Sequence, residues 1–166
     1  PQAFISIIRD ISGRIRAEKE LKESEAKYRA LFENAAETIV VVQDEYIKIC
    51  NTRTTGLSGY TQQELLSKPF IEFIYPDDRQ MVYDNYSRRL KGEKVESRYT
   101  FRILTKSGAI RWVELNVVAI EWEGKPATLN FITDITERKL SEDQLKENEA
   151  KYRTLFESAN DAIFLM

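Results

Sequence analysis

The 166-residue sequence is 42% hydrophobic and 11% aromatic, which suits one globular domain of about 100 residues with appended segments. Its 25 basic and 27 acidic residues are largely interleaved and leave a net charge of −2. Charge therefore gives no argument for binding nucleic acid or an anionic membrane surface. Histidine is absent, which excludes catalytic triads, histidine-ligated metals or haem, and phospho-acceptor histidines from this chain.

The single cysteine, Cys50, excludes an internal disulfide and a multi-cysteine metal site, and it is compatible with a reducing compartment. No run of 18 apolar residues occurs, so we expect no membrane-spanning segment in this sequence and no direct membrane contact. These features together predict a cytoplasmic location for this chain, with membrane attachment of the parent protein left open, and no bound metal.

A nine-residue motif occurs twice, at residues 25–33 (EAKYRALFE) and 149–157 (EAKYRTLFE). The same spacing of 124 residues relates Asp10-Ile11-Ser12 to Asp134-Ile135-Thr136. A fixed period indicates a repeat architecture. The sequence is therefore interpreted as one full repeat, plus the beginning of a second, from a longer string of similar domains.

The chain begins with residues 3–10, which predict a short β-strand, followed by a charged helix over 12–33 with Ser12 as its N-cap. A heptad register places Leu21 and Tyr28 on a narrow, partly polar seam of this helix. An isolated helix of this length is marginal in water, so we expect it to pair with another helix or to lie on a sheet. A solvated single-helix spacer is the alternative.

Two segments rich in β-branched residues, 38–43 and 46–50, are separated by two residues and predict a β-hairpin. Thr61 and Glu64 then have the spacing of a capping box, in which each side chain bonds to the other residue's backbone N–H. This pattern predicts a short helix at residues 62–66.

A longer helix is predicted from Asp77, its expected N-cap, to Gly92. Three strands follow, at residues 97–105, 110–121 and 127–133, and glycine-containing turns separate them. This order of elements predicts an α+β fold with one antiparallel sheet whose helices lie on one face.

Several residues at characteristic spacing carry a family resemblance: Asn51, Gly59-Tyr60, Glu64-Leu65, Tyr75-Pro76-Asp77-Asp78-Arg79, Gly92, Gly108, Arg111-Trp112, Gly124-Lys125-Pro126 and Asp134-Ile135-Thr136-Glu137-Arg138. No single match is specific, but all occur in order within residues 36–138. With this set the sequence resembles the PAS sensory domain of bacterial and archaeal sensor proteins, in its S-box/PAC form.

The resemblance implies a five-stranded antiparallel sheet in the order 2-1-5-4-3, with helices enclosing a small cavity on one face. It also implies a division of the chain into five parts: residues 1–11 as the last strand of a preceding PAS repeat, 12–35 as a linker helix, 36–136 as a complete PAS domain, 137–157 as a second linker helix, and 158–166 as the first strand of a following repeat. The two incomplete end strands, 4–10 and 162–166, are expected to be ordered by pairing, with each other across a dimer as one arrangement.

The same resemblance limits the cofactor. A flavin photosensor of this family would carry a cysteine in residues 51–57, which read NTRTTGL, and haem-binding relatives use a histidine on the longer helix. Cysteinyl-flavin and histidine-ligated haem are therefore argued against, whereas noncovalent flavin stays open without support. The cofactor is unknown, and an unidentified small-molecule ligand or an empty core remain the alternatives. Cys50 is expected to be a packed thiol.

The residues expected to line the cavity are apolar or aromatic and face inward in the predicted elements: Phe70, Phe73, Met81, Val82, Tyr86, Tyr99, Phe101, Ile103, Leu115 and Val117, with Ile39, Val41 and Ile74 as further candidates. The simpler interpretation is that they fill the core. Tyr86 and Tyr99 are the strongest ligand-binding candidates, because a buried hydroxyl needs a hydrogen-bond partner that a ligand could supply. Arg98 and Arg102 alternate with inward residues and are expected on the outer face.

Trp112 is predicted on that outer face, which in the family is commonly covered by the N-terminal helix or a partner subunit. We expect it to bury, with Val118 and Ile120, against that helix. The interface candidates are Leu21, Tyr28, Leu31, Phe32 and Trp112.

The resemblance further implies a sensory and signal-relay module of a multi-domain receptor, most closely a sensor histidine kinase. It would form a homodimer, with neighbouring PAS domains and an output domain in the parent chain. The signal would pass through a junction formed by Asp134, Ile135, Thr136, Glu137 and Arg138. An unliganded PAS domain used for dimerisation and spacing is the alternative, and no enzymatic activity is expected in this chain.

Overall fold

A computed structural model describes residues 2–164. Its centre is one antiparallel sheet in the order β2-β1-β5-β4-β3. The strands are β1 (Thr38–Gln43), β2 (Tyr46–Cys50), β3 (Arg98–Leu104), β4 (Ile110–Trp122) and β5 (Lys125–Asp134). This order confirms the predicted topology.

Two of the sheet's connections are two-residue hairpin turns built on left-handed backbone conformations. Asp44 and Glu45 have φ of 52° and 68° between β1 and β2, and Glu123 and Gly124 have φ of 49° and 78° between β4 and β5. Positive φ at both central residues matches the right-handed twist of the flanking strands. Each turn therefore fixes the register of the strand pair that it joins.

Short helices cover one face of the sheet: α2 (Thr52–Ser58), α3 (Gln62–Ser67), the 3-10 turns η1 (Phe70–Phe73) and η2 (Pro76–Asp78), and α4 (Arg79–Leu90). The capping box before α3 is present as predicted, with the Glu64 N–H donating to Thr61 Oγ1 and the Thr61 N–H donating to Glu64 Oε2. Helix α4 ends just before Gly92, whose φ is 79°.

The predicted N-cap of the longer helix is wrong. Asp77 lies inside η2, α4 begins at Arg79, and neither Asp77 nor Asp78 makes a side-chain cap. The Asp78 carboxylate instead bonds to Arg102 on β3. A charge-assisted bond across the fold outcompetes a local cap that is worth about 1 kcal/mol.

The core forms where alternate strand residues meet the helices. In β4, Val113, Leu115 and Val117 are buried, while Trp112 and Glu114 are half-buried and Asn116 is exposed. This pattern confirms the predicted alternation, because successive side chains in a strand point to opposite faces.

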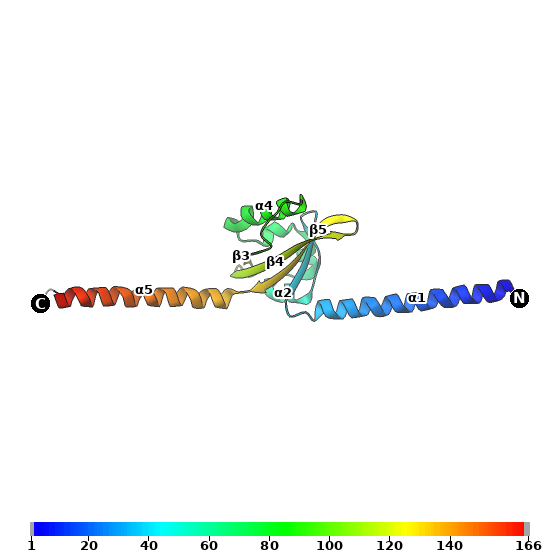
Figure 1. The fold of residues 1–166 in the computed structure, drawn as a ribbon, viewed down its shortest axis with the longest axis horizontal. Coiled ribbons are helices and arrows are strands. Elements are labelled where there is room, and N and C mark those ends of the chain that lie inside the picture. Colours follow the sequence, from blue (N-terminus) through cyan, green and yellow to red (C-terminus); the bar gives the residue numbers. More distant parts are fainter. Residues whose placement is uncertain (1, 165–166) are drawn as a thin grey trace.

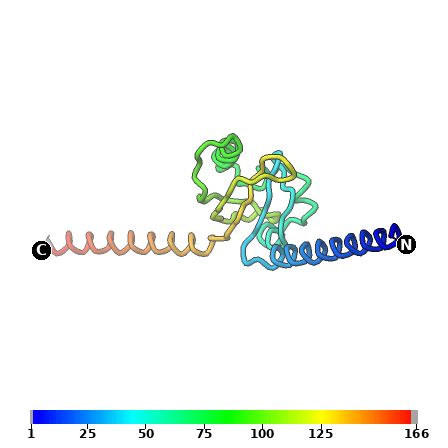
Figure 2. Tube along the Cα trace, turned by 45° about the vertical axis from the view of Figure 1, so that its right-hand side comes forward, coloured from blue at the N-terminus to red at the C-terminus, as the bar shows by residue number. Residues whose placement is uncertain are grey.

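Two long helices, α1 (Gln2–Glu33) and α5 (Thr136–Phe164), project from the domain in opposite directions (Figures 1 and 2). The predicted strand at residues 3–10 and the N-cap at Ser12 are therefore wrong, since α1 is continuous through both. The predicted strand beginning at 158 is also helical as far as Phe164, and its last two residues lie outside the described part of the chain.

The cause lies in the missing neighbours of these segments. Residues 127–133 are a strand because β5 bonds to both β1 and β4. Residues 3–9, at the equivalent place in the repeat, have no adjacent strand among the described residues. A strand without a pair leaves its backbone groups unbonded, whereas a helix satisfies them internally.

Candidate functional site

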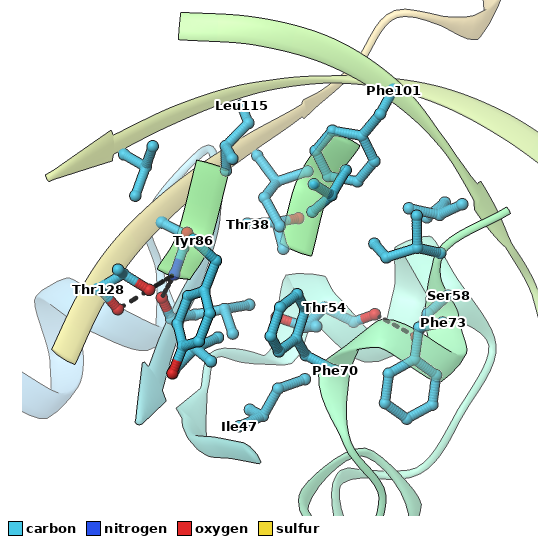
Figure 3. Close-up of a pocket in the computed structure, with 18 of the residues that line it drawn as sticks. Thr38, Ile47, Thr54, Ser58, Phe70, Phe73, Tyr86, Phe101, Leu115 and Thr128 are labelled. Carbon is cyan, nitrogen blue, oxygen red and sulfur yellow. Dashed lines mark hydrogen bonds between the residues drawn. The ribbon is translucent and has the colours of Figure 1, made fainter. Parts of the chain in front are cut away.

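A cavity of about 100 Å³ lies between the sheet and the helices that cover it. It sits where two hydrophobic clusters meet, and Phe70 and Ile132 pack against both. Figure 3 shows the rings of Phe70, Tyr86 and Phe101 directed into this region, with Thr38 and Leu115 contributed by the sheet. The Phe70 and Tyr86 rings are 4.9 Å apart. The lining is apolar except for a few hydroxyl, amide and guanidinium groups.

Of the ten main residues predicted to line the cavity, all except Met81 border it: Phe70, Phe73, Val82, Tyr86, Tyr99, Phe101, Ile103, Leu115 and Val117. Of the three further candidates, only Ile74 does. Met81 is 43% exposed, because it lies one helical step from the inward face that carries Val82 and Tyr86. The role of these residues in ligand binding stays a prediction.

The prediction of which β1 side chains face the cavity is also wrong. Thr38, Val40 and Val42 border the cavity, whereas Ile39 and Val41 do not. Every β1 residue except Ile39 is buried. The strand therefore has no alternation of apolar and polar residues from which its cavity-facing side chains could be predicted.

Sequence reasoning missed a set of polar lining residues: Thr54, Ser58, Arg89, Thr128 and Asn130. Arg89 could have been found, since it lies seven residues after Val82 and three after Tyr86, on the same face of α4. Asn130 donates from Nδ2 to the Val40 oxygen at 3.1 Å and to Thr128 Oγ1 at 3.0 Å.

The hydroxyl groups of Tyr86 and Tyr99 have different partners in the protein. The Tyr86 hydroxyl accepts from the Glu45 N–H at 3.2 Å, and burial raises its pKa. Burial also raises the pKa of the Tyr99 phenol, although the nearby positive charge of Arg89 and the Asn85 side chain counteract part of this effect. Tyr99 and Arg89 lie next to each other in the cavity wall.

A second group of side chains connects α4 to the outer face of the sheet. Arg102 donates from Nε and Nη2 to the two Asp78 carboxylate oxygens at 3.0 and 2.7 Å, and its guanidinium lies 4.3 Å from the Tyr75 ring centre. These bonds to Arg102 hold the pKa of Asp78 below its usual value. The same guanidinium lies 5.2 Å from the ring centre of Trp112, its partner on β4.

The predicted junction adjoins Trp112 at the start of α5. The Trp112 N–H donates to Thr136 Oγ1 at 3.0 Å, and the Ile135 N–H donates to the Trp112 oxygen at 2.9 Å. Thr136 also bonds to the Asp134 carboxylate, whose other oxygen pairs with Arg111 at 2.9 Å.

The remaining junction residues lie on the first turn of α5. Arg138 lies 3.7 Å from Glu114 of β4, whereas Glu137 is exposed. Lys139 Nζ lies 4.9 Å from the Trp112 ring centre. The first turn of α5 is thus held to β4 at several points.

Within one chain, helix α1 does not cover the outer face. Tyr28 and Leu31 are each 72% exposed, Leu21 and Val118 are exposed, and Phe32 is half-buried. The expected burial of Trp112 against α1 is therefore wrong for the single chain, because Trp112 is covered instead by Arg102 and Lys139.

Cys50 is buried, and this burial raises the pKa of its thiol, which suits a packed side chain. Among residues 2–164, no three acidic or cysteine side chains gather as metal ligands could. No helix of the described chain has the length and apolar character required to cross a membrane.

A single antiparallel sheet, helices on one face, a small cavity between the two layers and a strand-to-helix junction define an α+β domain with a potential ligand cavity in its core. Residues 47–132, slightly more than half of the chain, match the family described as PAS fold. The chain belongs to this family.

Known relatives agree with this assignment. The crystal structure of the PAS domain of an HTR-like protein from Haloarcula marismortui superposes with a TM-score of 0.60 at 31% identity, covering 72% of this chain and 98% of that chain. Sporulation kinase E of Bacillus subtilis is 27% identical over 161 residues, which cover 95% of this chain and 21% of the relative. Sensor histidine kinase TmoS of Ectopseudomonas mendocina is 27% identical over 130 residues, which cover 76% of this chain and 13% of the relative. The chain thus spans well under a third of these curated relatives.

Proposed function

We propose that this PAS domain is a sensory and relay module of a larger receptor of the sensor histidine kinase type. In this proposal, occupation of the cavity shifts α4, and the shift is passed to α5, which leads to an output domain in the parent chain. The observation that supports the proposal most directly is a continuous set of contacts from the cavity wall to the first turn of α5. The similarity to parts of sensor kinases supports the same conclusion.

The first half of this connection lies at the start of α4. Val82 and Tyr86 border the cavity from α4, and Asp78 immediately precedes this helix. Because the Asp78 carboxylate binds both the backbone N–H and the guanidinium of Arg102, a movement of α4 strains a defined set of charge-assisted bonds.

The second half runs along the outer face of the sheet. Arg102 stacks on Trp112, and Trp112 contacts α5 through its backbone and through Lys139. A displacement of Arg102 therefore changes the surroundings of the first turn of α5. Coupling free energies between two such sites are typically about 1–3 kcal/mol.

We further propose that the module is a homodimer paired through its long helices. Helices α1 and α5 carry the same exposed apolar side chains at the same spacing, with Leu21, Tyr28 and Leu31 on α1 repeated as Leu145, Tyr152 and Leu155 on α5. A stripe of this kind is stabilised by a second helix. Neighbouring PAS domains would continue the pairing, and a kinase output that uses ATP would place the module in the cytoplasm.

A structural role as an unliganded spacer and dimerisation domain is the second candidate. The small volume of the cavity favours it, because about 100 Å³ is below the 150 Å³ of an engineered cavity that holds benzene. The two roles differ in whether a small molecule enters the cavity and changes α5.

The distinguishing experiment uses the whole chain and two matched variants on β4. Val117→Phe fills the cavity from a buried position, whereas Val118→Phe adds the same volume on the exposed outer face. Native mass spectrometry and NMR titration with a small-molecule set would detect binding, and hydrogen exchange would report on the first turn of α5. Binding that slows exchange there in wild type and Val118→Phe, and is lost in Val117→Phe, supports the sensory role. No binding to folded wild-type protein supports the spacer role.

A further inference from the structure

We propose that the cavity accepts a short-chain monocarboxylate whose carboxylate pairs with Arg89. This inference rests on the proposed sensory function of the cavity and names its ligand class. Three observations support it: a buried guanidinium without an acidic partner, its position at the apolar cavity, and the size of that cavity.

Arg89 is unusually buried for an arginine. It is only 8% exposed, although it lies in the last turn of α4 and its neighbour Arg88 is half-exposed in an ion pair with Glu93. Its Nη2 donates to the main-chain oxygen of Glu96, and no carboxylate of the described residues forms an ion pair with it. A buried charge is normally paired, since desolvation without a counter-ion is strongly unfavourable.

The position of Arg89 explains how an anion could neutralise it. The side chain belongs to the cavity wall, next to the Tyr99 hydroxyl, while the rest of the lining is mostly aliphatic and aromatic. A guanidinium has five N–H donors in a planar fork that matches the two oxygens of a carboxylate. Tyr99 can add a hydroxyl donor at the same end. The cavity therefore has one cationic corner and one apolar body.

The cavity volume limits the length of the ligand. An engineered cavity of 150 Å³ holds benzene, which has six non-hydrogen atoms, so about 100 Å³ accommodates roughly four or five. A carboxylate with an alkyl chain of one or two carbons, such as acetate or propionate, has this size. Small ligands gain limited affinity per atom, so a dissociation constant on the order of micromolar is the strongest to be expected.

The test compares propionate with propionamide, which has the same shape without the charge, by calorimetry and NMR titration of the whole chain. Wild type is expected to bind propionate saturably and at least tenfold more tightly than propionamide. Arg89→Met is expected to weaken propionate binding at least tenfold, and Arg88→Met, its matched control with a surface charge removed, to leave binding unchanged.

The outcomes separate this inference from the sensory function itself. Equal affinity for propionate and propionamide, or equal losses in the two arginine variants, would overturn the carboxylate assignment while leaving a cavity that binds ligands. Binding of neither compound, in a wild-type protein shown to be folded by its melting curve, would overturn the assignment, and the wider small-molecule titration then decides the sensory role separately. The comparison of two ligands on wild type needs no variant, so it stands even if Arg89→Met fails to fold.

Discussion

Replacing Asn51 by Ala should destabilise the domain and loosen the end of α1. Asn51 is 1% exposed, and its side chain joins three segments: Nδ2 donates to the main-chain oxygens of Phe32 (3.1 Å) and Glu37 (2.9 Å), and Oδ1 accepts from the Ile39 N–H (3.1 Å). Truncation removes all three bonds to backbone groups. At roughly 1 kcal/mol for each, the expected loss in free energy of unfolding is about 3 kcal/mol.

The loss can be measured by urea denaturation followed by the fluorescence of Trp112 and Trp122, both of which lie on β4. For a domain of about 100 residues, such a change lowers Tm by roughly 12–24 °C. Asn34→Ala is the matched control, because Asn34 makes a single exposed bond to the Ala30 oxygen and should change stability by no more than about 0.5 kcal/mol. Equal effects of the two substitutions would refute the reasoning that burial of the Asn51 bonds determines their contribution.

Three further variants test the relay and the dimer. Because Arg102 lowers the pKa of Asp78 in the folded state, the ionised carboxylate stabilises the fold above its unfolded pKa, and this contribution is lost as pH falls through the folded pKa. Wild type should therefore lose more stability than Asp78→Asn between about pH 5 and pH 3, and parallel pH curves would contradict this. The double variant Leu31→Asp with Leu155→Asp should lower the dimer fraction in sedimentation experiments, whereas unchanged sedimentation would exclude the helix stripe from the interface. Thr136→Val should speed amide exchange in the first turn of α5 and reduce stability by about 1 kcal/mol, and unchanged exchange would show that this hydroxyl does not hold the helix.

The features that could be predicted from sequence are those set by local chemistry. The capping box of Thr61 and Glu64 needs only residues three apart, and the turns at 44–45 and 123–124 follow from short polar segments between strands. The alternation of β4 follows from one face being buried and the other partly exposed. Together with the family resemblance, these signals were enough for the strand order and for most of the cavity wall.

The features that could not be predicted depend on what lies next to a segment in space. Asp10-Ile11-Ser12 and Asp134-Ile135-Thr136 are nearly identical, yet the first lies within a helix and the second forms the end of β5 and the start of α5. Only the second has β1 and β4 beside its preceding residues. Arg89 is a different case, because its spacing from Val82 and Tyr86 already placed it on the inward face of α4, although charged residues at the end of a helix are usually solvated.

The attachment points of the two long helices are the places where the proposed relay would enter and leave the domain. Helix α1 is fixed at its end by Asn51 and by the Glu33 carboxylate, which accepts from the Thr52 N–H at 2.9 Å. Helix α5 is fixed at its start by Thr136 against Trp112 on β4. Both helices are therefore anchored to the same sheet, α1 at the end of β2 and α5 beside β4 and β5. A change in the sheet would alter the orientation of α5 relative to α1 and, in a string of repeats, the orientation of each domain relative to the following one.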